Sequence, residues 1–290
     1  MKRDAVAVDA AQGGAISARE LARGDGWQLW DYVCCAGPDD RPFEEVHTRM
    51  SISAVVAGTF NYRSGTGSAF LHPGAFLLGN TGVCYACGHE HGTGDRSISL
   101  QLEPEFFAEI AASAAGGSRF RFPCAGLVAS KDLVAAFSML HLAALRHDGL
   151  AGDEMAVRVA GAVSAHTSDH SLTPVRFGMR DERRIARVLQ HIAANGAEEL
   201  RLDDLARLAG MSRFHFLRVF RHVTGATPHA HILAHRMRQA AIALATSREG
   251  VAQIAFAAGF GDLSTFNARF RKTFGVTPTQ FRAQHGRGTR

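Results

Sequence analysis

The sequence has no long uninterrupted apolar stretch and only five cysteines among its 290 residues. No segment reaches the roughly 18 uncharged apolar residues needed to cross a bilayer, so we expect no transmembrane helix and no membrane partner. The first 20 residues are charged at Lys2, Arg3, Asp4 and Asp9 and have no apolar core, unlike a secretory signal. An odd, low number of cysteines fits a reducing cytosol better than a disulfide framework. We therefore expect a cytoplasmic protein.

Several common catalytic patterns are also absent. The sequence has no G-x-S-x-G motif, no phosphate loop and no dinucleotide-binding glycine pattern. The small-residue loop at 115–118 lacks the lysine that a phosphate loop needs. The composition, 46% hydrophobic and 20% charged, excludes disordered, collagen-like and long coiled-coil proteins. We expect a globular protein that is not an enzyme.

The charge is divided unevenly along the chain. The formal net charge is +5, but residues 1–175 hold 13 Lys and Arg against 19 Asp and Glu, a net of −6. Residues 176–290 hold 19 Lys and Arg against 8 Asp and Glu, a net of +11. The length suits two domains of roughly 100–200 residues each. A strongly basic second half indicates that this domain meets a polyanion such as nucleic acid.

The acidic half reads as strands followed by helices. Short apolar or β-branched runs alternate with turn residues between 27 and 102, which predicts a β-sandwich or barrel with strands at 50–57, 58–63, 75–78 and 97–102. Helical periodicity follows at 104–115, 131–147 and 154–166, with Ser130 and Asp153 as N-caps of the last two. These two helices form a hairpin that either covers the β domain or provides a dimer surface, and both roles are compatible.

A linker is predicted at 171–174, because Pro174 disfavours helix at the preceding residue. It divides the chain into domains 1–172 and 173–290. The second domain reads as helical almost throughout, with helices predicted at 181–195, 202–209, 213–223, 229–246, 251–258, 264–273 and 278–284.

Two segments of the basic half repeat each other. At an offset of 49 residues the sequence reads Leu205-Ala206-x-x-Ala209-Gly210-Met211 and then Ile254-Ala255-x-x-Ala258-Gly259-Phe260. At an offset of 50 it reads Phe216-x-x-x-Phe220-Arg221-x-x-x-x-Gly225-x-Thr227-Pro228 and then Phe266-x-x-x-Phe270-Arg271-x-x-x-x-Gly275-x-Thr277-Pro278. Each copy has a short helix, a glycine-bearing turn and a second helix, the pattern of a helix-turn-helix unit. The tandem match and the charge of +11 argue against accidental similarity within a plain helical bundle.

The repeat makes specific structural predictions for two units, at about 202–223 and 251–273. Gly210 and Gly259 are expected to have positive φ in the turns. The Phe pairs, four residues apart, are expected to lie on one helix face and fill the core. Ser212 is expected to cap the second helix of the first unit, and the segment 262–264 takes that role in the second.

The repeated motifs resemble the AraC/XylS family of transcription regulators. The resemblance covers about residues 181–284 and rests on Ser212-x-Phe214-x-Phe216-x-Arg218-x-Phe220-Arg221-x-x-x-x-Gly225-x-x-Pro228 and on Ile254-Ala255-x-x-x-Gly259-Phe260-Gly261-Asp262-x-Ser264-x-Phe266-x-x-x-Phe270-Arg271-Lys272-x-x-Gly275-x-Thr277-Pro278-x-x-x-Arg282. It implies an α+β chain, with an N-terminal cupin-like β-barrel and helical hairpin and a C-terminal all-α double helix-turn-helix module. It further implies a sequence-specific, ligand-responsive DNA-binding regulator, whose partners are operator DNA, a small-molecule effector, a second copy of the chain and, for an activator, RNA polymerase.

The resemblance places base contacts near Phe214, Leu217 and Arg218, and the other candidate DNA contacts are residues expected to be exposed on the second helix of each unit. The base-facing candidates are Arg213, Phe214, His215, Leu217, Arg218, Leu263, Ser264, Thr265, Asn267 and Ala268, and the phosphate-binding candidates are Arg221, Arg269, Arg271 and Lys272. Arg213 also suits a phosphate, and the alternative for Arg213 and Arg221 is a solvated helix face. Many family members carry an arginine where Ala268 stands, which shifts the second unit towards clamping the DNA backbone.

One stretch of the acidic half suggests chemistry. The segment 84–91 joins a C-x-x-C to an H-x-H, so Cys84, Cys87, His89 and His91 are candidate ligands for zinc or another divalent metal. A redox switch and simple packing in a strand are the alternatives. Two observations argue against a metal site. A strand would point Cys84 and Cys87 to opposite faces, and the glutamate of the usual cupin metal motif is missing.

Two other functions compete with a regulator. The first is a cupin-type metal-dependent enzyme fused to a DNA-binding module, which requires a bound metal. The second is a DNA-repair methyl acceptor with a zinc-bound cysteine cluster. The cysteines at positions 34, 35, 84, 87 and 124 are too dispersed in the sequence to match the compact cluster of the second function.

Overall fold

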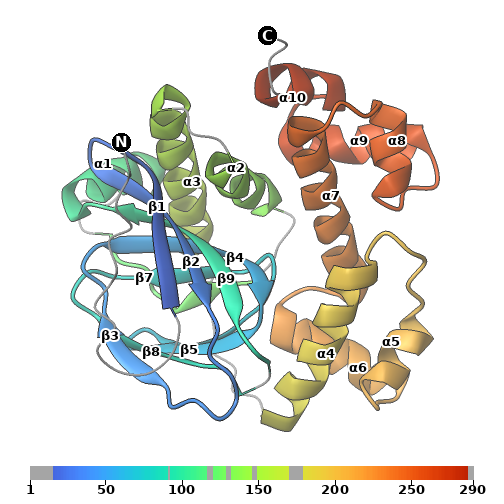
Figure 1. Cartoon of the computed structure of the whole chain (residues 1–290), viewed down its shortest axis with the longest axis horizontal. Coiled ribbons are helices and arrows are strands. Elements are labelled where there is room, and N and C mark those ends of the chain that lie inside the picture. Colours follow the sequence, from blue (N-terminus) through green and yellow to red (C-terminus); the bar gives the residue numbers. More distant parts are fainter. Residues whose placement is uncertain are drawn as a thin grey trace.

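The computed structural model describes residues 16–90, 92–115, 120–128, 132–145, 149–169 and 179–286. The first half of the chain is built of strands with three helices, and the described part of the second half is helical throughout. The two halves lie side by side in Figure 1, with the strands on the left and the helices of the second half on the right. This is the α+β architecture expected from the sequence.

Two antiparallel sheets form the first half. The six-stranded sheet has the order β1 (Ile16–Gly24), β2 (Trp27–Cys34), β9 (Asp95–Leu102), β4 (Met50–Gly58), β7 (Phe76–Gly79) and β10 (Gly126–Leu127). The four-stranded sheet has the order β3 (Phe43–Val46), β8 (Cys84–Gly88), β5 (Phe60–Ser64) and β6 (Gly67–Leu71). The four strands predicted from the sequence correspond to β4, β5, β7 and β9, whereas β1 begins before the predicted β region.

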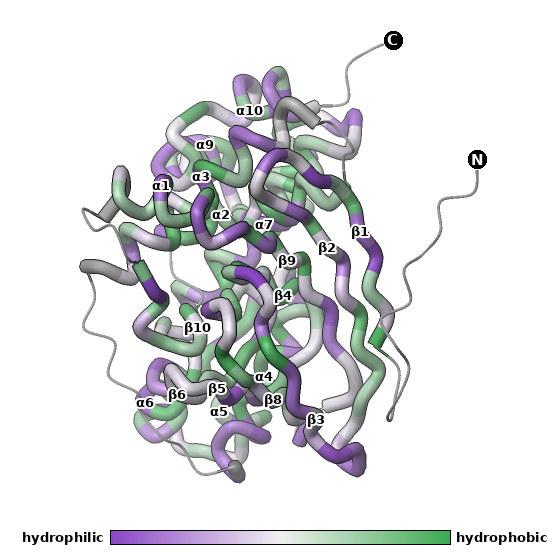
Figure 2. The backbone as a smooth tube through the Cα atoms, turned by 90° about the vertical axis from the view of Figure 1, so that its left-hand side faces the viewer, coloured by the Kyte–Doolittle hydropathy of each residue, from purple (hydrophilic) through white to green (hydrophobic). Residues whose placement is uncertain are grey.

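Strand β4 of the six-stranded sheet is buried on both of its faces, which point to opposite sides of the sheet. On β4, Ile52 and Ala54 pack towards the helices α1 (Pro104–Ala115), α2 (Val134–Ala144) and α3 (Gly149–Asp169). Val55 instead packs with Phe60 and Tyr62 of the four-stranded sheet. The layers are therefore helices, sheet and sheet. Figure 2 shows hydrophobic and hydrophilic positions interspersed along the strands, and a hydrophilic segment leading into β3.

The helical hairpin differs from the prediction at its start. The helix expected at 154–166 begins already at Gly149, so Asp153 is not its N-cap. Its Oδ1 atom accepts a hydrogen bond of 2.6 Å from Nε1 of Trp27. A Cβ atom at Gly152 would lie 2.6 Å from the Trp27 indole, so this glycine allows close helix–sheet packing instead of forming a turn. The predicted cap Ser130, the linker 171–174 and the predicted domain boundary lie outside the described residues.

Seven helices are described in the second half. They are α4 (Met179–Asn195), α5 (Leu202–Leu208), α6 (Arg213–Thr224), α7 (Pro228–Thr246), α8 (Val251–Ala257), α9 (Leu263–Phe274) and α10 (Pro278–His285). One apolar core joins α4, α5 and α6, and a second joins α7, α8, α9 and α10. In Figure 1 the long helix α7 connects the lower group, α4 to α6, with the upper group, α8 to α10.

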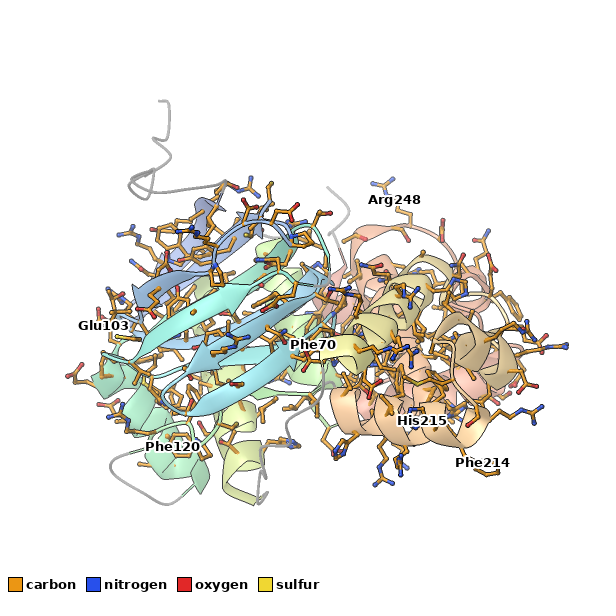
Figure 3. The ribbon with its side chains drawn as sticks, turned by 90° about the horizontal axis from the view of Figure 1, so that it is seen from below. Phe70, Glu103, Phe120, Phe214, His215 and Arg248 are labelled. Atoms are coloured by element: carbon orange, nitrogen blue, oxygen red, sulfur yellow. The ribbon has the colours of Figure 1, made fainter. Side chains whose placement is uncertain are left out.

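The two halves share apolar contacts. Val134 and Leu142 of α2 are buried in the same cluster as Ala234 and Met237 of α7. Phe70 of β6 packs against the core of α4 to α6, and Figure 3 shows it where the strands meet the helical half. The first half therefore contacts both groups of helices.

Buried basic side chains lie at the same interface. The rings of His72 and His231 are 5.2 Å apart, and both residues are almost completely buried. Burial lowers the pKa of His72 to about 4, with a smaller contribution from Arg238. The guanidinium carbon of Arg238 lies 5.1 Å from the centroid of the Phe137 ring of α2, a cation–π contact between the halves. Burial lowers the pKa of Arg238 to about 10.

Candidate nucleic-acid interface

The first unit is formed by α5, a turn and α6. Gly210 has a φ of 61°, as expected for the turn, and the Ser212 side chain caps α6 by accepting a hydrogen bond of 3.4 Å from the His215 N–H. Phe216 and Phe220 are completely buried. With these two rings turned inward, the opposite face of α6 is presented to solvent.

The exposed face of α6 combines aromatic and basic groups. Phe214 is 87% exposed, which is unusual for a phenylalanine, and Arg218 and Arg221 are exposed near it. A groove of about 580 Å³ lies on this face and is lined by Phe214, Leu217, Arg218, Arg221, His222, Gly225 and Thr227. In Figure 3, Phe214 projects from the lower edge of the helical half, and His215 is labelled above it. The sequence predicted four of these lining residues as DNA contacts but not His222, Gly225 or Thr227.

Arg213 has a neighbour that the sequence did not predict. Its Nη2 atom donates a hydrogen bond of 2.7 Å to Oδ2 of Asp203 on α5, and its Nε atom also pairs with this carboxylate. Arg218 instead lies near His215, with 3.4 Å between Nη2 and Nδ1. Asp203 and Arg213 are ten residues apart on two different helices, so helical periodicity in the sequence does not reveal their contact. Arg213 is thus tied to α5, whereas Arg218 has no acidic partner among the described residues.

The second unit repeats the arrangement with α8 and α9. Gly259 has a φ of 84°, and Asp262 caps α9 by accepting a hydrogen bond of 2.7 Å from the Thr265 N–H. This hydrogen bond lowers the pKa of Asp262. Phe266 and Phe270 are completely buried, in agreement with the repeat. All the predicted contact residues of this unit are exposed, namely Leu263, Ser264, Thr265, Asn267, Ala268, Arg269, Arg271 and Lys272.

Arg236 of α7 links the segment that follows α4 to the turn of the second unit. Its guanidinium donates to the backbone carbonyls of Gly196 (2.7 Å), Glu198 (2.7 Å) and Gly259 (2.6 Å). The first two carbonyls follow α4, and the third belongs to the turn of the second unit. One side chain therefore fixes the position of α4 relative to the α8–α9 turn. The repeat gave no signal for this residue, because it lies between the two copies.

The first half also contacts the end of α6. Gly225 ends α6 with a φ of 70°, and a Cβ atom at this position would lie 2.1 Å from Cγ2 of Val128, just after β10. Val128 is thus in close contact with the end of α6, beside the groove.

The candidate metal ligands of the first half are dispersed. Cys84 is exposed on β8, whereas Cys87 packs on the opposite face beside the cluster of Val55 and Tyr62, and burial raises the pKa of its thiol well above the ordinary range. His91 lies outside the described residues. His89 belongs to another group, in which its Nε2 atom is 2.6 Å from Oδ2 of Asp95. Burial disfavours the charged ring, but hydrogen bonding to Asp95 and Cys34 outweighs it and raises the pKa of His89 to about 9.

Known proteins resemble the basic half. A helix-turn-helix domain family matches residues 205–284. The TetD protein of transposon Tn10 from Escherichia coli is 37% identical over 95 residues, which are 33% of this chain and 69% of TetD. The regulator MtrA of Neisseria gonorrhoeae is 27% identical over 130 residues, 45% of this chain and 43% of MtrA. A solved regulator with an AraC-type DNA-binding domain from Chromobacterium violaceum is 28% identical over 39% of this chain and 100% of its own, with a TM-score of 0.35.

Two capped helix-turn-helix units and these relatives define a DNA-binding transcription regulator. The chain belongs to the AraC/XylS family, as its repeated motifs indicated. It spans about two thirds of TetD but less than half of MtrA. None of the helices that the structure describes has the length and apolar character needed to cross a membrane.

Proposed function

We propose that the protein binds operator DNA sequence-specifically by placing α6 and α9 in successive major grooves of one duplex. The observation that carries this proposal is the pairing of two capped helices on the single helix α7, each with its repeated Phe pair buried and its polar face exposed. The 19 residues of α7 span about 28 Å at 1.5 Å per residue. Successive major grooves on one face of B-DNA are about 34 Å apart, which is a comparable distance.

In the first unit, we assign base contacts to Arg213, Phe214, His215, Leu217 and Arg218 and a phosphate contact to Arg221. Arg218 is the principal reader, because its guanidinium has no carboxylate partner in the described chain and arginine pairs bidentately with guanine. Phe214 supplies an exposed apolar surface for a thymine methyl group. The ion pair with Asp203 restricts Arg213, so this pair must open or be shared when Arg213 contacts a base.

In the second unit, we assign base contacts to Leu263, Ser264, Thr265, Asn267 and Ala268. Asn267 matches adenine, and Leu263 and Thr265 match a thymine methyl group. The Ala268 side chain has no hydrogen-bonding group. This unit therefore relies for its affinity on Arg269, Arg271 and Lys272, which bind DNA phosphates electrostatically. The three basic side chains are exposed and have no acidic partner in the part of the chain that the structure describes.

For the first half, we propose the roles of effector-sensing and dimerisation. Supporting this, α2 packs against α7 and Val128 packs against the end of α6, so a rearrangement of the first half acts directly on both units. A small-molecule effector would shift the balance between two such arrangements. The hairpin of α2 and α3 is the proposed dimer surface, and RNA polymerase is the further partner if the protein activates transcription. We propose a cytoplasmic regulator without catalytic activity, with domains at 1–172 and 173–290.

The test compares Arg218→Ala with Arg23→Ala, which removes the same charge from the exposed strand β1 in the first half. Binding of the full chain to a selected operator and to a random duplex is measured at one fixed salt concentration. We expect Arg218→Ala to weaken operator binding by about 5- to 150-fold, from the roughly 1–3 kcal/mol of a bidentate guanine contact. Random-duplex binding should change only a few-fold, and Arg23→Ala should change binding to neither duplex. An equal loss on both duplexes would remove Arg218 from the base-reading set.

A further inference from the structure

We propose that Cys34, His89 and Asp95 form a binding site for one divalent metal ion of the zinc class, between the two sheets of the first half. Cys34 is the last residue of β2, and Asp95 is the first residue of β9. The two are direct partners across these antiparallel strands. His89 follows β8 in the other sheet. A metal ion held by all three residues therefore joins one sheet to the other.

The ligand atoms are already close together. The Cys34 sulfur, a ring nitrogen of His89 and a carboxylate oxygen of Asp95 all lie within 4.8 Å of one another. Zinc bonds of about 2.0–2.3 Å in tetrahedral geometry place ligand atoms roughly 3–4 Å apart. The hydrogen bond of 2.6 Å between His89 and Asp95 must lengthen by roughly 1 Å for both residues to reach one tetrahedral ion. The metal ion then replaces the proton that this hydrogen bond holds.

The donor set selects the class of ion. One thiolate, one imidazole and one carboxylate suit zinc and cobalt, whereas magnesium and calcium require oxygen ligands. Three protein ligands leave a fourth tetrahedral position for water or another small ligand. Among the described residues, this is the one group of three or more such side chains with compatible spacing.

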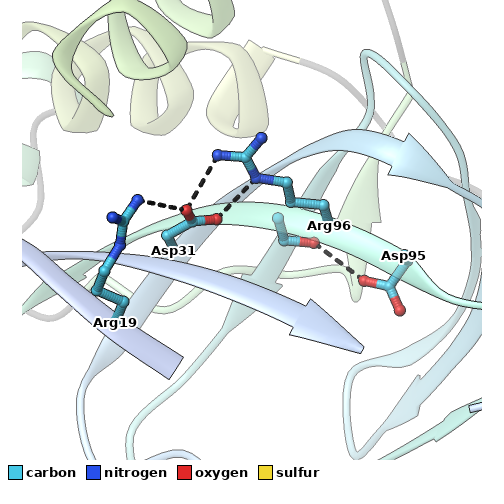
Figure 4. A network of polar contacts seen from close by, with 5 residues as sticks. Arg19, Asp31, Asp95 and Arg96 are labelled. Carbon is cyan, nitrogen blue, oxygen red and sulfur yellow. Dashed lines mark hydrogen bonds and ion pairs between the residues drawn. The ribbon is translucent and has the colours of Figure 1, made fainter. Parts of the chain in front are cut away.

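The surroundings hold the ligands in position, as is typical of metal sites. Cys34 is 7% exposed and His89 is 4% exposed. The His89 ring stacks on Phe60, with 5.7 Å between the ring centroids. The other carboxylate oxygen of Asp95 accepts a hydrogen bond of 3.4 Å from Ser97, and Figure 4 shows the carboxylate of Asp95 in this contact. These contacts restrict the imidazole and the carboxylate before any ion binds.

A glycine makes the close approach of Cys34 and Asp95 feasible. Gly94 has a φ of +74°, and a Cβ atom on it would lie 2.7 Å from the Cys34 carbonyl oxygen. The neighbouring Gly58, with a φ of +77°, would meet the Gly94 carbonyl oxygen at 2.2 Å. Side chains at these positions would push β4 and β9 away from the end of β2.

The test uses the full-length chain after removal of metal with a chelator. Zn²⁺ and Co²⁺ are titrated separately, and thiolate-to-cobalt charge-transfer absorption reports a Cys–metal bond. We expect one equivalent of Co²⁺ with this band, displaced by Zn²⁺, and a higher melting temperature with Zn²⁺. Cys34→Ser should abolish the band, and Asp95→Asn should weaken binding at least tenfold while the band persists at saturating Co²⁺. Cys84→Ser, on the exposed side of β8, is the matched control and should bind as the parent does.

Either of two results overturns the proposal. The first is the absence of stoichiometric binding by the parent chain whose circular dichroism shows it to be folded. The second is a charge-transfer band that survives Cys34→Ser or disappears in Cys84→Ser, because the metal would then bind elsewhere. The first result is measured on the parent chain, so it can overturn the proposal even if a variant misfolds.

Discussion

The two turn glycines provide a matched comparison. Gly210 and Gly259 occupy equivalent positions in the repeat, with φ angles of +61° and +84°. A Cβ atom at Gly210 would meet no atom within 4 Å, but at Gly259 it would lie 2.4 Å from the carbonyl oxygen of Ala197 and 2.8 Å from the guanidinium carbon of Arg236. Both alanine variants incur the left-handed backbone penalty of about 1–2 kcal/mol. Gly259→Ala adds an overpacking cost of about 1–3 kcal/mol, because a backbone carbonyl must move.

We therefore expect Gly210→Ala to lower the free energy of unfolding by about 1–2 kcal/mol and Gly259→Ala by about 2–5 kcal/mol. Urea unfolding of the full chain, followed by circular dichroism of the helices and checked by calorimetry for the transition of the helical half, measures both. Gly275→Ala is the control, because its φ is +77° and no atom lies within 4 Å of the added Cβ; it should behave like Gly210→Ala. Equal losses for Gly210→Ala and Gly259→Ala would refute the steric argument.

Three further predictions concern the interface and the DNA contacts. The pKa of His72 is lowered to about 4, below its ordinary 6.5, so its contribution to stability is complete above pH 6.5 and is lost as the pH falls towards 4. This pH-dependent contribution to the free energy of unfolding amounts to about 3 kcal/mol at 1.36 kcal/mol per pKa unit. In thermal melts, the melting temperature of His72→Gln should therefore fall less steeply than that of the parent chain between pH 6.5 and pH 4. Arg236→Gln removes three hydrogen bonds to backbone carbonyls that join the segment after α4 to the turn of the second unit. Gel-shift titrations should therefore show a larger loss of affinity for a complete operator than for a duplex with only one half-site. Lys272→Ala should reduce the slope of log affinity against log salt by about 1 at unchanged sequence preference, and an unchanged slope would contradict its phosphate contact.

The features predicted from the sequence are those that depend on neighbouring residues. The Phe pairs, the turn glycines and the Ser212 cap are determined by spacings of a few residues, and the structure agrees with each of them. Strands β4, β5, β7 and β9 of the first half were predicted for the same reason, from short runs between turn residues, whereas β1 and β10 lie outside the predicted β region.

The features that were missed depend on contacts between distant parts of the chain. Asp153 and Trp27 are 126 residues apart, so their contact could not be predicted, and Asp153 was assigned a local capping role that it does not have. His89 was grouped with cysteines near it in the sequence, although a thiol within 4.8 Å of its ring belongs to Cys34, on a strand of the other sheet. The pairing of strands decides such neighbours, and a single sequence does not specify that pairing.

The buried contact between α2 and α7 limits how freely the helical half can be exchanged between related regulators. Val134 and Leu142 of α2 lie in the same buried cluster as Ala234 and Met237 of α7. A hybrid regulator that joins this helical half to the first half of a relative would therefore present α7 to an unmatched surface. To keep communication between the halves, such a chimera must carry α2 along with α7 or redesign both surfaces together.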